Sequence, residues 1–198
     1  MRYSIDELLS GLVGTQAPSY VISTADLKEF LRVEHSEEDT LIEAMREAAI
    51  KHIEGVTNIR IGQRIAYIRY DQVYSEFEIP IGPITTTSFG IQYAQAADDP
   101  NGSMVKDTDY YVDFYRKPAR VHIINVPNVY DYNFHKLKVT ALVGYDAAST
   151  PPAIVHAIKL LVAHMYELRQ PEVIGTITTQ VKLGLDALLN PYRIVSFR

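Results

Sequence analysis

The sequence predicts an α+β fold: an N-terminal helix pair and a long C-terminal helix form a helical bundle, with an inserted antiparallel β region of about five or six strands. Two observations predict it. Toward both ends of the chain, apolar residues recur every three or four positions, as on one face of a helix. Between residues 63 and 150 they alternate with other residues and turn formers separate the runs. The expected parts are an N-terminal arm with a short helix (1–22), the helical core (23–62 and 151–169), the β region (63–150) and a C-terminal docking tail (170–198).

Composition favours one well-packed core. The 198 residues are 47% hydrophobic and 22% charged, which is ordinary for a soluble globular protein. The absence of cysteine excludes disulfides and zinc–thiolate sites. No apolar stretch approaches the roughly 18 residues of a membrane span, and Asp6 and Glu7 interrupt the short apolar N-terminus, so we expect neither a membrane protein nor a secretory signal.

The net charge of −5 is unevenly distributed. Residues 1–60 hold 11 acidic and 6 basic side chains, residues 61–150 hold 10 and 8, and residues 151–198 hold 3 and 5. Tight binding to nucleic acid phosphates usually requires clustered Lys and Arg in excess. The balance therefore argues against a dedicated DNA-binding protein and is compatible with an acidic surface past which DNA moves without binding.

The arm contains a short amphipathic segment that predicts a small helix, ending at Gly14 and followed by an extended linker. Its apolar residues are Ile5, Leu8, Leu9, Leu12 and Val13. Ser23 or Thr24 is then expected to cap a first core helix that runs through Val33.

The second core helix is expected to begin near Ser36 and Asp39, which have the spacing of a capping box, and to end at Gly55. One face of it is marked by Leu41, Ile42, Met45, Ala48, Ala49, His52 and Ile53. Because only a few residues join the two helices, they should lie side by side.

The β region follows as a series of short strand-like runs. They are residues 65–70, 77–79, 85–93, 110–115, 121–124 and 138–145. Turn-forming residues separate them, most clearly at 82–83, 98–102, 116–119 and 127–128. The acidic turn at 98–102 superficially resembles a calcium loop, but Pro100 occupies a ligand position, so a hairpin turn is the better interpretation.

The long helix spans residues 151–169, with Pro152 suited to its first turn and Ser149 or Thr150 as its expected cap. One apolar face comprises Ile154, Ile158, Leu161, Met165 and Leu168. Further apolar residues spread beyond that face, so the helix has to be covered on more than one side. We infer that a neighbouring subunit supplies part of the cover, through Val155, Leu160, Val162, Tyr166 and Arg169.

Gln170 and Pro171 are expected to end the long helix. An extended stretch (174–183) and a short helix (185–189) stopped by Pro191 should follow. The last seven residues, YRIVSFR, are apolar and basic, and an exposed run of this kind has to be covered. It either folds back on its own subunit or docks on a partner.

We find no catalytic or cofactor motif: no Walker loop, glycine-rich dinucleotide turn, GxSxG or HExxH. The six histidines are scattered, and His156 and His164 are eight residues apart, too far for one ion. We therefore expect no enzyme, no metal and no cofactor. Segment 110–122 interleaves aromatic and basic residues as single-strand binders do, through Tyr111, Tyr115, Arg116, Lys117 and Arg120. A two-faced strand followed by a basic turn explains the same pattern.

An ordered series of segments carries a family resemblance. They are TADLKEFLRV, DTLIEAMREAAIKHIEG, IPIGPITTTSFGIQY, DYYVDFYRKPARV, VTALVGYD, PPAIVHAIKLLVAHMYELR and LDALLNPYR. In this order and spacing the chain resembles the head-tail connector (adaptor, or head-completion) proteins of tailed bacteriophages and gene transfer agents, some described as DNA-packaging proteins. The resemblance covers about residues 23–193.

The resemblance implies a non-enzymatic virion structural protein, assembled in the bacterial host cytoplasm and located in the neck between capsid and tail. It implies a homo-oligomeric ring of about twelve copies, a dodecamer, under the portal protein. Neck, stopper or tail proteins would be further partners, and genomic DNA would pass through the channel without specific binding. The portal-docking residues would be Leu188, Leu189, Pro191, Tyr192, Arg193, Ile194, Val195, Phe197 and Arg198.

Overall fold

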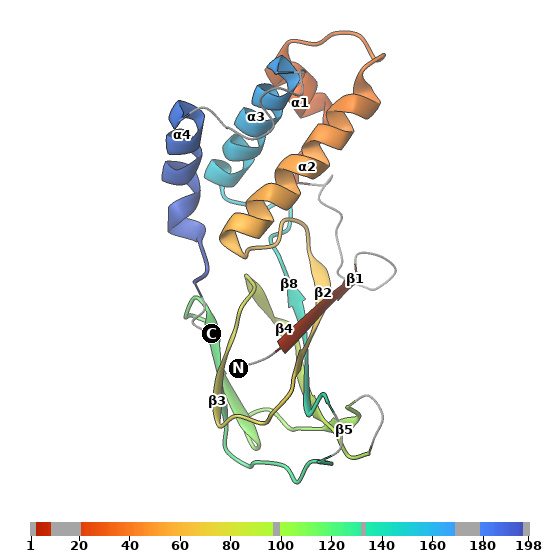
Figure 1. Cartoon of the computed structure of the whole chain (residues 1–198), viewed down its shortest axis with the longest axis vertical. Helices are drawn as coiled ribbons and strands as arrows, with labels where there is room; N and C mark the ends of the chain where they lie inside the picture. The colour runs from red at the N-terminus through yellow and green to blue at the C-terminus, as the bar shows by residue number, and fades with distance from the viewer. Residues whose placement is uncertain (1–2, 9–20, 97–99, 132–133, 169–178, 196–198) are drawn as a thin grey trace. The chain divides into compact units, whose positions relative to one another are not determined.

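The structure is a computed structural model that describes residues 3–8, 21–96, 100–131, 134–168 and 179–195 (Figure 1). The chain divides into two compact units. The β unit comprises Met1–Gln16, Gln63–Gly144 and Ile194–Arg198, and the helical unit comprises Ala17–Gly62 and Tyr145–Arg193. The described residues hold α-helices in one unit and antiparallel sheets in the other, which confirms the predicted α+β class.

Two antiparallel sheets make up the β unit. The five-stranded sheet has the order β1 (Tyr3–Leu8), β2 (Arg64–Tyr70), β8 (Leu137–Val143), β4 (Ile84–Tyr93) and β5 (Gly102–Ser103). The three-stranded sheet has the order β3 (Glu76–Ile79), β7 (Ala119–Ile123) and β6 (Tyr110–Asp113). Each of the six runs expected from the alternation contains a strand, and β4 pairs antiparallel with β5. Residues 98 and 99 of the turn predicted at 98–102 lie outside the described residues.

The two sheets enclose one hydrophobic core. Buried and less buried residues alternate along β2, because successive side chains of a strand point to opposite faces. Tyr70 of β2 is fully buried, and its ring centroid lies 4.7 Å from that of Phe77 in the other sheet. The Tyr70 hydroxyl donates a 3.0 Å hydrogen bond to the carbonyl oxygen of Glu78. The polar end of this buried ring is therefore satisfied.

The helix predicted at the start of the N-terminal arm is wrong over Tyr3–Leu8, because these residues form strand β1. β1 pairs antiparallel with β2, from Tyr3 opposite Tyr70 to Leu8 opposite Ile65. Tyr3 and Ile5 pack against the core, and Ser4 between them is exposed. This period of two and the pairing with β2 outweigh a weak helical pattern. Leu9, Leu12 and Val13 lie outside the described residues.

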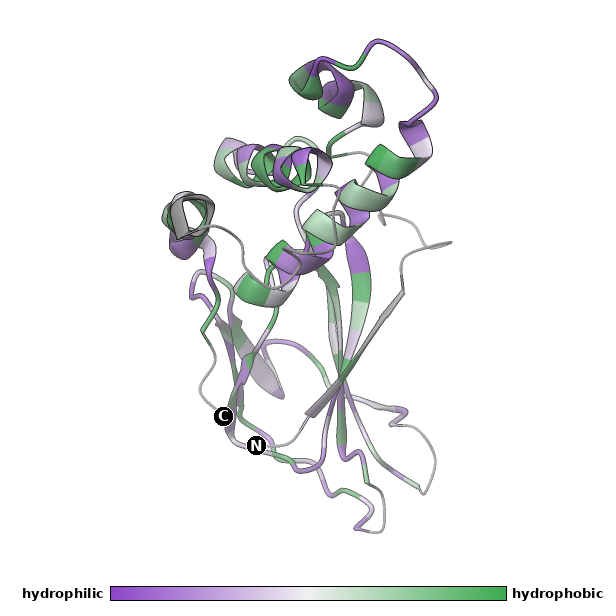
Figure 2. Ribbon diagram, turned by 45° about the horizontal axis from the view of Figure 1, so that its top comes forward, coloured by the Kyte–Doolittle hydropathy of each residue, from purple (hydrophilic) through white to green (hydrophobic). Residues whose placement is uncertain are grey.

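The helical unit consists of α1 (Thr24–Leu31), α2 (Asp39–Thr57), α3 (Pro152–Glu167), α4 (Thr179–Leu189) and the short 3₁₀ helix η3 (Asn190–Tyr192). α3 contacts α1, α2 and α4, and it lies between α2 and α4 (Figures 1 and 2). Hydrophobic positions, green in Figure 2, alternate with hydrophilic ones along α2. Its buried residues, Ile42, Ala49, Ile50 and Ile53 among them, share one face, as expected for an amphipathic helix.

The first helix begins as predicted, with Ser23 as its N-cap. The Asp26 amide donates to Ser23 Oγ at 3.1 Å, and the Ser23 amide donates to the Asp26 carboxylate at 3.0 Å, so a capping box forms here. The helix ends at Leu31, two residues before the predicted end, because Arg32 adopts a left-handed conformation with φ 58°.

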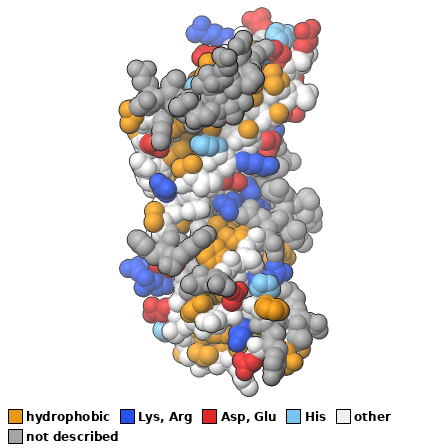
Figure 3. Space-filling model, in the orientation of Figure 1, with side chains coloured by type: hydrophobic (Ala, Val, Ile, Leu, Met, Phe, Trp, Pro, Cys, Tyr) orange, Lys and Arg blue, Asp and Glu red, His pale blue; other side chains and the backbone are white. Residues whose placement is uncertain are grey.

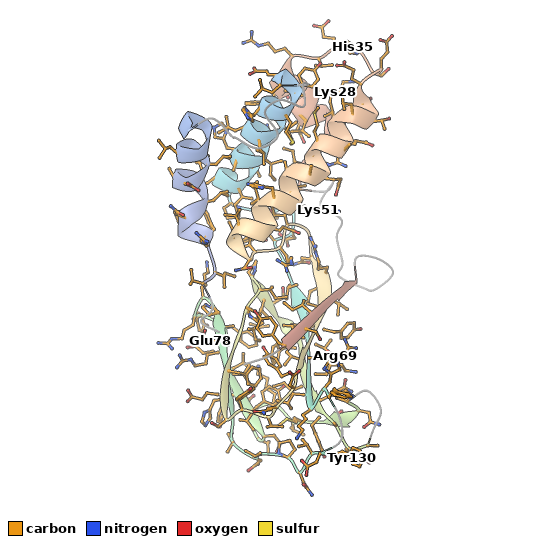
Figure 4. All side chains as sticks on the ribbon, in the orientation of Figure 1. Lys28, His35, Lys51, Arg69, Glu78 and Tyr130 are labelled. Carbon is orange, nitrogen blue, oxygen red and sulfur yellow. The ribbon has the colours of Figure 1, made fainter. Side chains whose placement is uncertain are left out.

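The capping box predicted at Ser36 and Asp39 is wrong. The N-cap of α2 is Glu38, with no side-chain capping hydrogen bond, and the Asp39 carboxylate instead lies 2.7 Å from Lys28 Nζ of α1 (Lys28 is labelled in Figure 4). The predicted end at Gly55 is also wrong, because α2 continues to Thr57 and left-handed Asn58 (φ 57°) follows it. Asparagine tolerates this conformation and replaces glycine as the stop signal.

Two expectations about the C-terminal helices also need correction. The N-cap of α3 is Pro151; Ser149 and Thr150 bond to Asp146 instead, through Ser149 N to Asp146 Oδ1 (2.6 Å) and Thr150 Oγ1 to the Asp146 carbonyl (2.6 Å). α4 begins at Thr179, so the last five residues of the stretch expected to be extended (174–183) are helical. Residues 174–178 lie outside the described part of the chain.

Candidate docking segment

The C-terminal segment is held to the helical unit by the inner side of α4. Leu185 and Leu189 are both 4% exposed, and α4 contacts α3. Pro191 cannot continue an α-helix, and the chain tightens into η3 before it becomes extended at Arg193 (φ −67°, ψ 125°). The Arg193 amide donates to the carbonyl of Asn190 at 3.2 Å. Chain direction at this point is therefore set by local backbone bonding as well as by packing.

Tyr192 lies beside a second tyrosine of the helical unit. Burial raises the pKa of the Tyr145 phenol, and the nearby Tyr192 raises that pKa further. Backbone bonds fix the position of Tyr145, whose amide donates to the Arg60 carbonyl at 3.0 Å and whose carbonyl accepts from the Gly62 amide at 3.0 Å. Tyr192 is partly buried, so only part of its surface is available to another molecule.

Ile194 is an internal anchor of the β unit. Its side chain is 4% exposed, and its Cδ1 lies 2.9 Å from the position that a Cβ on Gly82 would occupy. Gly82 itself is buried, and the next residue, Pro83, accepts the 2.8 Å hydrogen bond of the Gly144 amide. The C-terminal segment thus folds back on its own chain at this residue, which was one of the two alternatives left open by the sequence.

The residues predicted to dock on the portal fall into three groups. Leu189 and Ile194 are buried in the chain and have almost no surface to offer a partner. Pro191, Arg193 and Val195 are exposed, and Leu188 and Tyr192 are partly exposed. Phe197 and Arg198 lie outside the described residues. Burial of Leu189 and Ile194 could not be read from the sequence, because they belong to the same apolar pattern as their exposed neighbours.

The long helix α3 obtains much of its cover from its own chain. α1, α2 and α4 all contact it, so the broad apolar surface of α3 does not by itself require a neighbouring subunit. Val162 is fully buried and has no surface for a second subunit, whereas Val155, Leu160 and Tyr166 are partly exposed. The Tyr166 hydroxyl donates to the Glu38 carboxylate. Arg169, the last residue of the predicted ring interface, lies outside the described part of the chain.

The aromatic and basic segment 110–122 forms β6, a turn and most of β7. Tyr115 is fully exposed and Tyr111 is 54% exposed. Arg120, however, lies 3.4 Å from the Glu78 carboxylate and 3.8 Å from that of Glu76. Figure 3 shows basic, acidic and histidine side chains side by side at this edge of the β unit.

The other basic residues of this segment are Arg116 and Lys117. Arg116 lies 3.9 Å from the Asp113 carboxylate, and Lys117 is exposed in the turn. Because carboxylates offset the charges of Arg116 and Arg120, the segment lacks the positive surface that phosphate binding requires. The two-faced strand is thus the better interpretation.

The described residues contain no group of three or more His, Asp or Glu side chains placed to hold a metal ion. Among the helices that the structure describes, none is long and apolar enough to cross a membrane.

No protein-family model matches the sequence, and no curated protein matches it. Solved structures do match over nearly the full length. A chain from the virion of a native gene transfer agent (GTA) particle has a TM-score of 0.76 at 19% identity, and one from the neck of a native GTA particle, computed with C12 symmetry, has 0.71 at 19%. A chain from the neck of an empty GTA particle, computed with C6 symmetry, has 0.68 at 20%. Each match covers 98% of this chain and 97% of the other. At this identity, what the chains share is the fold.

Proposed function

We propose that this chain is a structural head-tail connector (adaptor) protein of a virion neck, with no enzymatic role. One observation carries the proposal: the fold matches chains from GTA virion and neck structures over 98% of its length, without a large unmatched part on either side. Fold alone does not imply function. The agreement in fold comes on top of the ordered sequence segments that resemble this same class.

In the proposed assembly about twelve copies form a ring under the portal protein and complete the channel for DNA. The symmetry of the matching necks, C12 for one and C6 for another, supports a ring of this kind. The helices form the ring body as a bundle, and Val155, Leu160 and Tyr166 of α3 are the predicted interface residues that retain surface for a neighbour. The net charge of −5 suits a channel that must not bind DNA tightly.

Portal docking is assigned to the exposed part of the C-terminal segment. Val195 is 53% exposed beside the anchored Ile194, and Arg193 before it is exposed and able to pair with a carboxylate. Phe197 and Arg198 extend the same apolar and basic run. Ile194 then fixes the point from which the docking residues project, while Val195 and its exposed neighbours make the contact.

The test replaces exposed residues and leaves the anchor intact. Deletion of residues 192–198 would remove Ile194 and disturb the β unit, so it cannot separate docking from folding. We expect Val195→Asp to leave the fold unchanged and to abolish capture of the full-length chain by purified portal protein, because it places a charge in an apolar contact. Val126→Asp is the matched control, since Val126 is a similarly exposed valine of the same unit (63%). Portal capture unaffected by Val195→Asp and Arg193→Glu together would refute the docking assignment.

A further inference from the structure

The helical unit has two outer helices, one on each side of α3 (Figures 1 and 2). Each turns its buried residues inward: Ile42, Ala49 and Ile53 on α2, and Leu185 and Leu189 on α4. The opposite face of each helix is left without cover from the described residues. These two faces, called here the α2 edge and the α4 edge, differ in sequence and lie on opposite sides of the unit.

The α4 edge is apolar and has little side-chain bulk. Leu183 is 65% exposed, and Gly184, Ala187 and Pro191 are also exposed. Their spacing of three and four residues places Leu183, Ala187 and Pro191 on one face of the segment. An outer helix face with no exposed charge at its centre is typical of a contact surface, because solvated faces normally carry charged residues.

The α2 edge is also largely apolar and runs along a longer helix, but it carries one exposed charge, Lys51, between Ala48 and Gly55. Leu41 is 40% exposed, and Ala44, Ala48 and Gly55 continue the exposed face at helical spacing. Glu43 accepts a 3.1 Å hydrogen bond from the Thr24 hydroxyl and so is turned toward α1.

Each edge also contains a glycine that the chain's own packing does not require. A Cβ added at Gly55 or at Gly184 would meet nothing within 4 Å. Glycine within a helix is destabilising relative to alanine. A glycine that lines open space on an outer face leaves the helix backbone open to close approach by another helix.

Each edge has one charged side chain without a described partner, and the two are of opposite sign; the acidic groups on the exposed side of α2 have partners, since Glu43 accepts from Thr24 and Glu47 lies 3.4 Å from Arg46. Lys51 is exposed on α2 (labelled in Figure 4), and Asp186 flanks the α4 edge. Neither has an ion-pair or hydrogen-bond partner among the residues that the structure describes. Contact between two α2 edges would place two lysines in one interface, and contact between two α4 edges would place two aspartates in one interface. Contact between unlike edges brings the lysine toward the aspartate.

We infer that the occupant of each edge is a second copy of this chain, the α4 edge of one copy meeting the α2 edge of the next. The contact is head-to-tail, so an open row of copies has a free α2 edge at one end and a free α4 edge at the other, and the row can close into a ring when these two meet. The inference rests on the proposed ring and assigns its subunit contact to residues outside the α3 set predicted from the sequence.

The test uses the absence of cysteine from the chain. Ala48→Cys and Ala187→Cys place one thiol on each edge at exposed positions, so neither should disturb the fold. In the double variant of the full-length chain, mild oxidation should give a ladder of crosslinked oligomers on denaturing gels. Each single variant should remain uncrosslinked, because unlike edges meet. The control pairs Ala48→Cys with Ala25→Cys on α1, another exposed helical alanine outside both edges.

Native mass spectrometry of the unsubstituted chain, at concentrations up to about 1 mM, shows whether rings form, independently of which edges meet. Rings without a ladder in the double variant would overturn the edge assignment and leave the proposed ring intact, and a chain that stays monomeric throughout would overturn both. Dimers of either single variant would show like edges meeting and would also overturn the inference. As a second measurement, Lys51→Asp should weaken oligomer formation about tenfold, and adding Asp186→Lys should restore it. Loss without restoration would count against the pairing.

Discussion

We predict that substitutions at Gly82 and Ile194 have coupled effects on the free energy of unfolding, because Ile194 is held against Gly82. A methyl group at Gly82 would lie 2.9 Å from Ile194 Cδ1, closer than carbon atoms pack, so Gly82→Ala should displace the isoleucine and destabilise the β unit by about 1–2 kcal/mol. Ile194→Ala truncates a side chain that is 4% exposed and should lower the free energy of unfolding of the β unit by about 2 kcal/mol. This is the low end for a buried isoleucine, because a terminal segment can relax into the cavity more easily than the centre of a core.

The double variant separates this contact from general damage. Once Ile194 is shortened, nothing blocks the methyl group on Gly82, so the two losses should fail to add, by about 1 kcal/mol or more. Urea unfolding gives the free energies. The two units of the chain need not unfold together, so a local measurement is also needed. The Gly144 amide donates to the Pro83 carbonyl at 2.8 Å, and its hydrogen-exchange rate reports the stability of the backbone next to Gly82. Losses that add within about 0.5 kcal/mol would refute the reasoning.

Further predictions concern the stability contributed by Ser23, Glu54 and Tyr70. Ser23→Ala removes the N-cap of α1 and should lower the free energy of unfolding by about 1 kcal/mol in thermal melts followed by circular dichroism; no change would contradict the capping role. The hydrogen bond from the Ser23 side chain holds the pKa of Asp26 in the folded state below its ordinary value of 3.8, so the folded state binds fewer protons at this carboxylate than the unfolded state. The ionised Asp26 therefore stabilises the fold above pH 3.8, and this contribution is lost as the pH falls through the lowered pKa. In Ser23→Ala that acid dependence should shrink, as pH-dependent melts would reveal. The Glu54 carboxylate accepts a 2.7 Å hydrogen bond from the Ile61 amide, and Glu54→Leu removes this acceptor, so it should lower the free energy of unfolding by about 2 kcal/mol. Glu54→Gln keeps an acceptor oxygen and should lower it less. Equal losses for the two variants in urea titrations would contradict this role of Glu54. Tyr70→Phe should lower the free energy of unfolding by about 1 kcal/mol in the same urea titrations, because the Glu78 carbonyl of β3 loses the hydrogen bond that the Tyr70 hydroxyl donates.

The candidate docking segment could be predicted from the sequence as one region, but the sequence could not separate its buried residues from its exposed ones. An apolar and basic run after a helix-stopping proline identifies the region. Within it Ile194 and Val195 are chemically alike, yet one is 4% and the other 53% exposed. Ile194 lies against Gly82, a residue more than a hundred positions earlier, and no local pattern contains that pairing.

Local signals fixed the helices and strands where one short-range rule dominates. Ser23 with Asp26 caps α1, Pro152 opens α3, and the alternation from residue 64 yields β2 with its buried and less buried faces, because capping, ring geometry and the pleat act over a few residues.

Tertiary structure decided the remaining features, in which distant partners compete with local preference. The weakly helical start of the chain became β1 because β2 supplies a full register of hydrogen bonds. Asp39 pairs with Lys28 instead of forming a capping box with Ser36. The unusually apolar α3 is covered by α1, α2 and α4 of its own chain, since burial of a broad apolar surface depends on which helices the fold places around it, and sequence periodicity specifies the face but not its neighbour.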